Sequence, residues 1–499
     1  MATTEGAAGA GGGRRLVHSA QVIIVGSVMF TFISYWRTAA VVLCDLASTA
    51  YYIGGIVEQA IGKAAPWFIL AVMLFSYAVR SVYIESCSLF VRGGVYRVVK
   101  EAMGGFLAKL SVSALMFDYI LTGPTSGVSA GAYIMGLMMD VVKYISPALY
   151  TQLGLDNDDY RKAVQRWGSV LIACAITVYF FRQNILGIHE SSDKALKIMI
   201  ATTLMAVIML AWCGVTLALR SPDELNTVPW KPDLKPKVEY EVVTRPDRVT
   251  GEPDREQWKR DPKTKELVPQ RENGHDVPKK NEATEDQQDP LGFISRFWPG
   301  LAEKLHGLGE ETIPWLSLIG VMGIFIAFGH SILAMSGEET LAQVYREVES
   351  PKLPNFKKAA FIVFVYSLVL TAGISFLAVA LIPDEVRMKD YSDNLIGGLA
   401  MYVAGPHWAR LFLNLFVVFV GFLILAGAVN TAIIGSNGVL NRVAEDGVLP
   451  DWFLKPHPKY GTTYRLLILI TSLQVGVILL SMGHVIVLGE AYAFGVVWS

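Results

Sequence analysis

The chain has 499 residues, of which 53% are hydrophobic and only 17% are charged, and its formal net charge is −1. Soluble domains average about 25% charged residues, so this composition excludes a soluble protein and predicts one that lies in a lipid bilayer. The balanced charge creates no field that would attract nucleic acid. The four cysteines (Cys44, Cys87, Cys174 and Cys213) lie in apolar runs without a CxxC pair, which excludes a disulfide framework and a zinc finger.

Apolar segments long enough to cross a hydrocarbon core of ~30 Å recur along the chain. Residues 1–19 predict a disordered tail, and residues 20–36 predict an extra N-terminal helix that is either interfacial or spanning. Ten core spans follow at 38–61, 66–91, 107–139, 167–182, 194–219, 313–336, 357–383, 408–434, 464–482 and 483–499. The last span reaches Ser499 without a polar flank, so we expect it to be cut short.

Lysine and arginine in short loops predict the orientation of the spans. Basic residues concentrate in the 92–109, 340–358 and 435–465 loops, which places these loops in the cytoplasm. Residues 220–312 then form a charged extracytoplasmic insertion between a first transmembrane repeat, 38–219, and a second, incomplete repeat, 313–499. The insertion is rich in charge and proline, which predicts an extended or disordered loop with one hairpin near 238–253. A partner-binding or pore-capping role for it stays open.

The first core span carries a carboxylate in its middle third, at Asp45. Burying a charge there costs at least ~2.5–3.5 kcal/mol on insertion scales, so the residue is a candidate for function. Ser48, Thr49, Tyr52 and the pair Gly54–Gly55 follow closely, a composition that favours a broken helix with free carbonyls and hydroxyls. The alternative, a helix–helix contact lined by small residues, leaves Asp45 without a partner.

The third span repeats this pattern at Asp118. Thr122 and Ser126 follow four and eight residues later and share its helix face, and Tyr119 lies next to that face. Pro124 removes a backbone donor and weakens the helix nearby. One carboxylate with two hydroxyls suits a dehydrated cation. The alternative is a protonated aspartate that is hydrogen-bonded within the bundle.

The sixth span also places polar residues and glycine inside an apolar helix. His330, Ser336 and Gly337 are followed directly by Glu338 and Glu339. His330 is either a proton relay or a packing residue. Spans one and six lie five apart in order, and both are polar and interrupted by glycine, which indicates an inverted-repeat transporter with its site near the bilayer midplane.

These motifs resemble the amino acid–polyamine–organocation (APC) superfamily of secondary transporters. The sixth-span residues 334–339, followed by 347–351, resemble its AxSGxE…EExxxP signature. Residues 92–96 with 100–104 are similar to its segment after the second span, and 184–192 to its connection between spans four and five. The resemblance covers about 38–499 apart from the insertion, and it implies an all-α, LeuT-like fold of five plus five spans with broken helices 1 and 6.

Within the superfamily the chain looks most like the bacterial potassium-importer branch. The SDALSSxAYG and DYILT runs of that branch supply cation ligands. The matching or corresponding polar residues here are Asp45, Ser48, Tyr52, Asp118, Tyr119, Thr122, Ser126 and Ser336. The chain departs from the branch in its insertion and at Ile433, where a ligating tyrosine is usual. The uncharged, glycine-rich first-span motif of typical amino acid permeases is also missing.

We therefore expect a proton-coupled importer of a small cation or amine-bearing solute, either potassium or an organocation, in a bacterial inner membrane. Coupling needs a titrating intramembrane carboxylate, for which Asp45 is the first candidate and Asp118 the second. No enzyme, cofactor or metal motif is visible, and a homodimer stays open. Two alternatives remain: an amino acid permease, and a non-transporting sensor that signals through the 221–295 loop.

Overall fold

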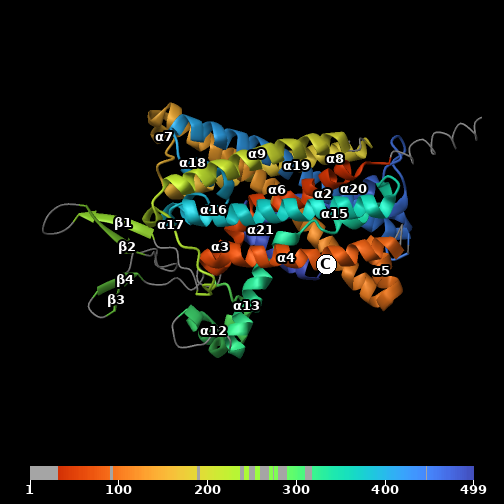
Figure 1. Ribbon diagram of the computed structural model, residues 1–499, viewed down its shortest axis with the longest axis horizontal. Coiled ribbons are helices and arrows are strands. Elements are labelled where there is room, and N and C mark those ends of the chain that lie inside the picture. The colour runs from red at the N-terminus through yellow and green to blue at the C-terminus, as the bar shows by residue number, and fades with distance from the viewer. Residues whose placement is uncertain are drawn as a thin grey trace, which may run out of the picture.

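The computed structural model describes residues 32–89, 94–187, 192–235, 241–246, 253–258, 269–272, 275–278, 289–309, 317–445 and 447–498. Long helices run side by side across the molecule, with α7 (Pro147–Gln152) and α17 (Asp384–Asp390) at one end and α5 (Gly94–Met103) at the other (Figure 1). We call these ends the α17 end and the α5 end. The expected all-α membrane fold is confirmed.

The first half of the bundle contains the predicted spans one to five. Its helices are α2 (Tyr35–Leu46), η1 (Ala47–Tyr51), α3 (Ile53–Ile61), η2 (Gly62–Ala64), α4 (Ala65–Leu89), α5, α6 (Gly105–Ile145), α7, α8 (Asp158–Ile185) and α9 (Ser192–Leu219). The chain thus crosses the bundle in broken form once, through α2, η1 and α3, before the long helices begin.

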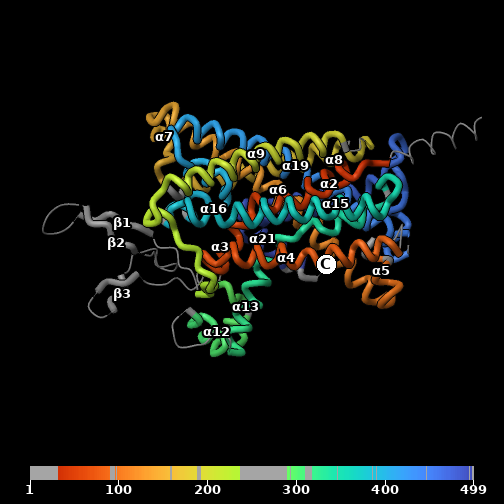
Figure 2. Tube along the Cα trace, viewed as in Figure 1, coloured from red at the N-terminus to blue at the C-terminus, as the bar shows by residue number. Residues whose placement is uncertain are grey.

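The second half contains the predicted spans six to ten. Its helices are α13 (Leu318–Ser331), η5 (Ile332–Met335), α14 (Thr340–Val344), η6 (Tyr345–Glu347), α15 (Lys352–Ser367), the π-helical turn η7 (Leu368–Ala372), α16 (Gly373–Leu381), α17, α18 (Leu395–Tyr402), α19 (His407–Glu445), η8 (Asp451–Leu454), α20 (Tyr464–Leu480) and α21 (Val485–Trp498). Figure 2 shows the traces of α15 and α16 running end to end across the bundle.

The insertion contains two hairpins where the sequence predicts one. Strand β1 (Glu241–Pro246) pairs antiparallel with β2 (Pro253–Trp258), and β3 (Pro269–Glu272) pairs antiparallel with β4 (His275–Pro278). The segment also contains η3 (Pro222–Glu224), α11 (Phe293–Phe297), α12 (Pro299–His306) and η4 (Gly307–Gly309). Its first residues lie against the bundle, because Asn226 donates from its side chain to the carbonyls of Val379 and Ile382.

The described residues contain seven segments long and apolar enough to cross a membrane, one of which joins α3 to α4 as Ile53–Leu89. Ten spans were predicted, and the difference lies in short helices: α2, α20 and α21 have 12, 17 and 14 residues. Helix α2 begins at Tyr35, so it takes in the last two residues of the helix predicted at 20–36. The rest of that prediction up to residue 31, and the 1–19 tail, lie outside the described residues.

Helix α6 is the central element of the bundle and packs against α8, α19 and α21. Gly123, Gly127 and Gly131 recur every four residues along one face, a spacing that lets helix backbones approach closely. A Cβ atom at Gly131 would lie 2.5 Å from the Cα atom of Ser169 in α8, so only glycine fits there. The helix stays continuous through Pro124, although the sequence predicted a weakened helix at that residue.

A buried ion pair joins the broken first span to α17 at the α17 end. The guanidinium of Arg387, 1% exposed, donates to both carboxylate oxygens of Glu58 in α3 at 2.7–3.0 Å. It also donates to Asp384, which pairs in turn with Lys63. Burial acts to raise the pKa of Asp384, but its hydrogen bonds with Lys63 and Arg387 outweigh burial and lower that pKa.

We predict that Arg387→Ala destabilises the protein by about 3–5 kcal/mol, because the buried Glu58 carboxylate then loses the guanidinium that donates to both of its oxygens. Lys63→Ala is the control: this lysine belongs to the same network, but its side chain is 39% exposed, and such pairs contribute about 1 kcal/mol or less. The free energy of unfolding in detergent checks both variants. Equal small losses would contradict the structural role of the buried pair.

Candidate functional site

The first span is interrupted between Asp45 and Ile53. The helix tightens into the 3-10 turn η1, and Tyr52 leaves helical geometry altogether, with φ −127° and ψ −24°. Ser48 and Thr49 donate from their hydroxyls to the carbonyls of Asp45 and Leu46, both at 2.6 Å. Such hydroxyls replace backbone donors that a broken helix lacks. Asp45 therefore lies on the last turn of α2, at the edge of the break.

Gly54 and Gly55 lie inside α3 and not at the break, contrary to the expectation from the sequence. A Cβ atom at Gly55 would lie 1.9 Å from the carbonyl oxygen of Ser392, and one at Gly54 would lie 2.6 Å from Leu395. These glycines therefore allow the segment before α18 to approach α3 closely. They supply no ligand groups to the site, and the hydroxyl-rich run from Ser48 to Tyr52 forms the break itself.

The break in the sixth span lies beside the break in the first. After η5 the chain leaves helical geometry at Ser336, and Gly337 has a φ of +92°, a conformation that favours glycine. Turns η1 and η5 pack against each other, as do α14 and α2. The hydroxyl of Thr340, the first residue of α14, donates to Oδ2 of Asp45 at 2.7 Å. The two breaks thus form one polar region.

The last described helix completes this region through Tyr492. Its hydroxyl accepts a hydrogen bond of 2.6 Å from Thr122 in α6 and is hydrogen-bonded to Ser336 at the break of span six. The carboxylate of Asp118, 1% exposed, interacts with the same Tyr492 and Thr122 hydroxyls. Helices α6 and α21 and the broken span six therefore meet at one chain of hydroxyl groups beside Asp118.

Three of the predicted ligands have hydrogen-bonding capacity that the described residues do not use. The hydroxyl of Tyr52, Oδ1 of Asp118 and the hydroxyl of Ser126 are buried without a hydrogen-bond partner in the described part of the chain. The large majority of buried side-chain polar atoms in proteins have a hydrogen-bond partner, and leaving one unpaired costs about 1–3 kcal/mol. Tyr52 lies beside the hydroxyls of Ser48 and Ser126 and interacts with Asp45 and Asp118. These oxygens face a common region.

The two glutamates after Gly337 have different surroundings. Glu338 forms a buried ion pair with Arg80 of α4, with nitrogen–oxygen distances of 2.7 and 3.0 Å. Glu339 is also buried, and its carboxylate interacts electrostatically with Asp118 and Asp45. The described residues contain no group of three acidic, histidine or cysteine side chains placed to hold a metal ion, so the three carboxylates do not converge on one point.

The structure thus brings together Asp45, Ser48, Tyr52, Asp118, Thr122, Ser126 and Ser336. Tyr119 is buried nearby, but its hydroxyl accepts from Gln343 of α14, and its ring packs on Gly435 of α19. His330 is hydrogen-bonded to the carbonyl of Pro290 at 2.8 Å, which favours the packing role over the proton relay.

From the sequence, Glu339 is assigned no role in the site, and neither Thr340 nor Tyr492 is singled out. Glu339 and Thr340 directly follow the Ser336–Gly337 break, so their position along the chain was a usable signal. Tyr492 lies 370 residues from Thr122, and no sequence spacing indicates that its hydroxyl meets the third and sixth spans.

We predict that Gly337→Ala lowers the melting temperature, because a Cβ atom would lie 3.0 Å from the backbone nitrogen of Leu46 and 3.2 Å from Cγ of Asp45, at a positive φ. Gly329→Ala in the same span is the matched control. A Cβ atom there meets nothing within 4 Å, and alanine favours the helix by up to about 1 kcal/mol. Equal melting temperatures for the two variants would contradict the close contact of the two breaks.

Comparison with known families matches the sequence model described as Amino acid permease to residues 33–244 and 281–499. A comparison with curated proteins finds no match. The matched ranges make up most of the chain, and they contain both breaks, α6 and Tyr492. Permeases move solutes across membranes, which indicates a transporter rather than an enzyme. The chain therefore belongs to the amino acid permease family and is an integral, multi-pass membrane transporter of the APC type.

Proposed function

We propose that the protein is a secondary active transporter that takes up a small cation or an amine-bearing solute, either potassium or an organocation, together with protons. The observation that carries the proposal is the set of unpartnered oxygens of Tyr52, Asp118 and Ser126 beside two buried carboxylates. In the described part of the chain, no ion pair reaches Asp45 or Asp118, whereas Glu338 has Arg80.

A buried carboxylate needs a cation or a proton, because an isolated charge in a low-dielectric interior is expensive. A cation bound among Asp45, Asp118, Tyr52 and Ser126 would satisfy the carboxylates and the orphaned hydroxyls together, since hard cations prefer oxygen ligands. An ammonium group would use the same oxygens as acceptors. Uptake together with protons requires both to occupy the site at once, so one carboxylate would carry the proton while the other ligates the cation, and both would be released on the cytoplasmic side.

The proposal includes a LeuT-like arrangement in which spans one to five and six to ten form two inverted repeats. The broken helices in spans one and six, which meet at Asp45 and Thr340, support this arrangement. The α17 end then faces outside, in a bacterial inner membrane, and the basic loops beside α5 face the cytoplasm.

An amino acid permease is the second candidate, and the family match favours it. An α-amino acid presents a carboxylate as well as an ammonium group, and the carboxylate would meet Asp45, Asp118 and Glu339. Like charges at such distances repel strongly in a buried site. An amino acid substrate therefore requires either that these side-chain carboxylates are protonated or that the substrate carboxylate is held away from them.

Ligand-induced stabilisation separates the two candidates, because a ligand that binds only the folded state raises the melting temperature. We expect purified protein to be stabilised by potassium or putrescine, and not by alanine, at matched ionic strength and pH. Lysine, which carries a side-chain ammonium group, is informative as an intermediate case. Stabilisation by alanine alone would contradict the cation proposal and support the amino acid permease.

Proton coupling is tested by Asp45→Asn, which removes the titrating charge and keeps the acceptor for Thr340. We expect this variant to lose accumulation driven by a pH gradient in proteoliposomes, while exchange of substrate in the absence of a gradient continues. Glu85→Gln, an exposed carboxylate on α4, is the matched control and should accumulate substrate normally. Normal accumulation by Asp45→Asn would exclude Asp45 from the coupling mechanism.

A further inference from the structure

A single hydroxyl joins the break in span one to a helix at the α17 end. Tyr133, on α6, is fully buried. Its hydroxyl donates to the carbonyl oxygen of Tyr51 at 2.7 Å and accepts from the backbone N–H of Ile396 at 3.2 Å. Tyr51 is the last residue of η1, and Ile396 is the second residue of α18. Three elements that are distant in sequence therefore meet at one oxygen atom.

Both backbone groups lack an ordinary helical partner, which explains why the hydroxyl is needed. The first hydrogen bond of α3 runs from Ile56 to the carbonyl of Tyr52, so the carbonyl of Tyr51 lies outside that helix. The first four N–H groups of any helix also lack intrahelical acceptors. Asn394, the residue before α18, makes no side-chain cap. Tyr133 therefore satisfies two buried groups that the breaks in the chain leave open.

Helix α3 and the segment around α17 and α18 form one closely packed unit. Gly55 lies against the carbonyl of Ser392, and Glu58 is paired with Arg387. Tyr133 is on a different helix, α6, which also carries Asp118. Any separation of this unit from α6 must therefore break the two hydrogen bonds of Tyr133.

The face of α6 between Asp118 and Tyr133 is polar and incompletely paired. Thr122, Ser126, Ser129 and Tyr133 follow one another at intervals of three or four residues, which places them on one face. The hydroxyls of Ser126 and Ser129 are buried and have no hydrogen-bond partner among the described residues. The face leads from Asp118 toward the α17 end over about 22 Å of helix, at 1.5 Å per residue.

We propose that Tyr133 is a positioning residue that closes the route from the site to the α17 end by holding the break of span one and α18 against α6. The proposal rests on the proposed function only in that a solute uses this route. The Tyr133 hydroxyl bonds to backbone groups and not to Asp45 or Asp118. Its hydroxyl sets whether the face carrying Ser129 is accessible from the α17 end.

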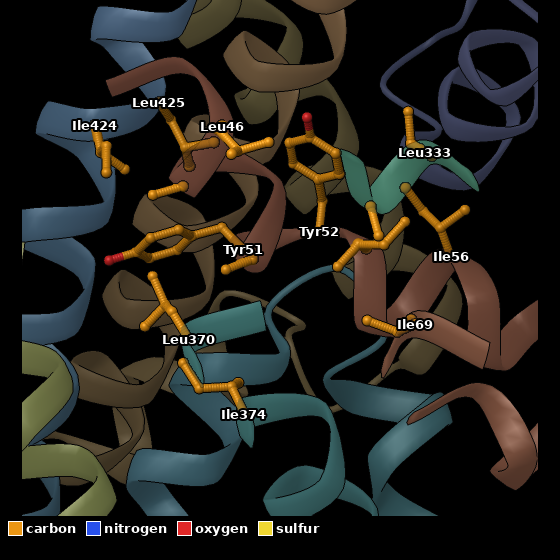
Figure 3. Packing of buried hydrophobic residues seen from close by; sticks show 14 of the residues in the cluster. Leu46, Tyr51, Tyr52, Ile56, Ile69, Leu333, Leu370, Ile374, Ile424 and Leu425 are labelled. Atoms are coloured by element: carbon orange, nitrogen blue, oxygen red, sulfur yellow. The ribbon is translucent and has the colours of Figure 1, made fainter. Parts of the chain in front are cut away.

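Tyr51 provides a matched control of the same chemistry. Its ring lies 5.2 Å from the ring of Tyr133, edge to face, so both are buried in one cluster. Figure 3 shows that the side chains of Tyr51 and Tyr52 point in different directions, with the Tyr51 ring on the side of Leu370 and Ile424. The Tyr51 hydroxyl has no hydrogen-bond partner in the described part of the chain. Tyr51→Phe therefore removes an unused hydroxyl, whereas Tyr133→Phe removes the one that joins three elements.

The test uses the full chain with its four native cysteines replaced by alanine and one cysteine introduced at a time. Ser129→Cys is the probe on the route, and Ser436→Cys, at a buried serine in the α5 half of α19, is the second probe. An impermeant thiol reagent is added from the α17 side. We expect Tyr133→Phe to speed labelling at the first probe by roughly 3- to 10-fold, as expected for a lost hydrogen bond, and to leave the second probe unchanged. Tyr51→Phe should change neither rate.

Equal labelling rates of the first probe in Tyr133→Phe and Tyr51→Phe would overturn the proposal. Equal acceleration of both probes by Tyr133→Phe would also overturn it, because it indicates that the whole bundle has loosened. If Tyr133→Phe does not fold, hydrogen exchange on the unaltered protein decides. The amides of α18 and of α6 around Tyr133 should then respond together when potassium or alanine is added, and independent responses would contradict the link. Labelling needs no substrate, so faster labelling without any transport would retain the role of Tyr133 and reject the proposed function.

Discussion

Asp45 is buried at the end of a broken helix, and its burial determines how the breaks of spans one and six must meet. A carboxylate in the hydrocarbon core is unfavourable by several kcal/mol unless a proton, a cation or hydrogen bonds compensate it. Thr340 supplies a compensating hydrogen bond, and this bond requires the break of span six to lie against the break of span one. The positive φ of Gly337 and the absence of a Cβ atom there make that contact sterically feasible.

The buried acidic residues fall into two groups that differ in how their charge is compensated. Glu338 and Glu58 are as buried as Asp45, yet each has an arginine, and each links helices that are distant in sequence. Asp45, Asp118 and Glu339 interact with one another, and the groups around Asp45 and Asp118 are hydroxyls. Buried acids paired with arginine hold the bundle together, while acids beside hydroxyls can carry a proton or ligate a cation.

The sequence predicted the helical fold, and local composition also singled out several polar residues that lie close together in the structure. Intramembrane aspartates are rare, so Asp45 and Asp118 could be identified as candidate site residues from the sequence. Helical spacing then predicted that Thr122 and Ser126 lie on the same face as Asp118. Long-range geometry was not predictable. The hydroxyl of Tyr492, the pairing of Arg80 with Glu338 and the use of Gly54 and Gly55 for packing all depend on which helices become neighbours. No periodicity within one span carries that information.

In the proposed mechanism, the oxygens at the two helix breaks bind a cation and move it with protons. Uptake by the purified full-length protein in proteoliposomes tests this claim most directly, with rubidium as a tracer for potassium, putrescine and alanine compared under the same imposed pH gradient. We expect accumulation of rubidium or putrescine that depends on the pH gradient and is abolished by a protonophore, with little accumulation of alanine. Accumulation of alanine without either cation, or uptake of a cation that does not respond to the pH gradient, would contradict it.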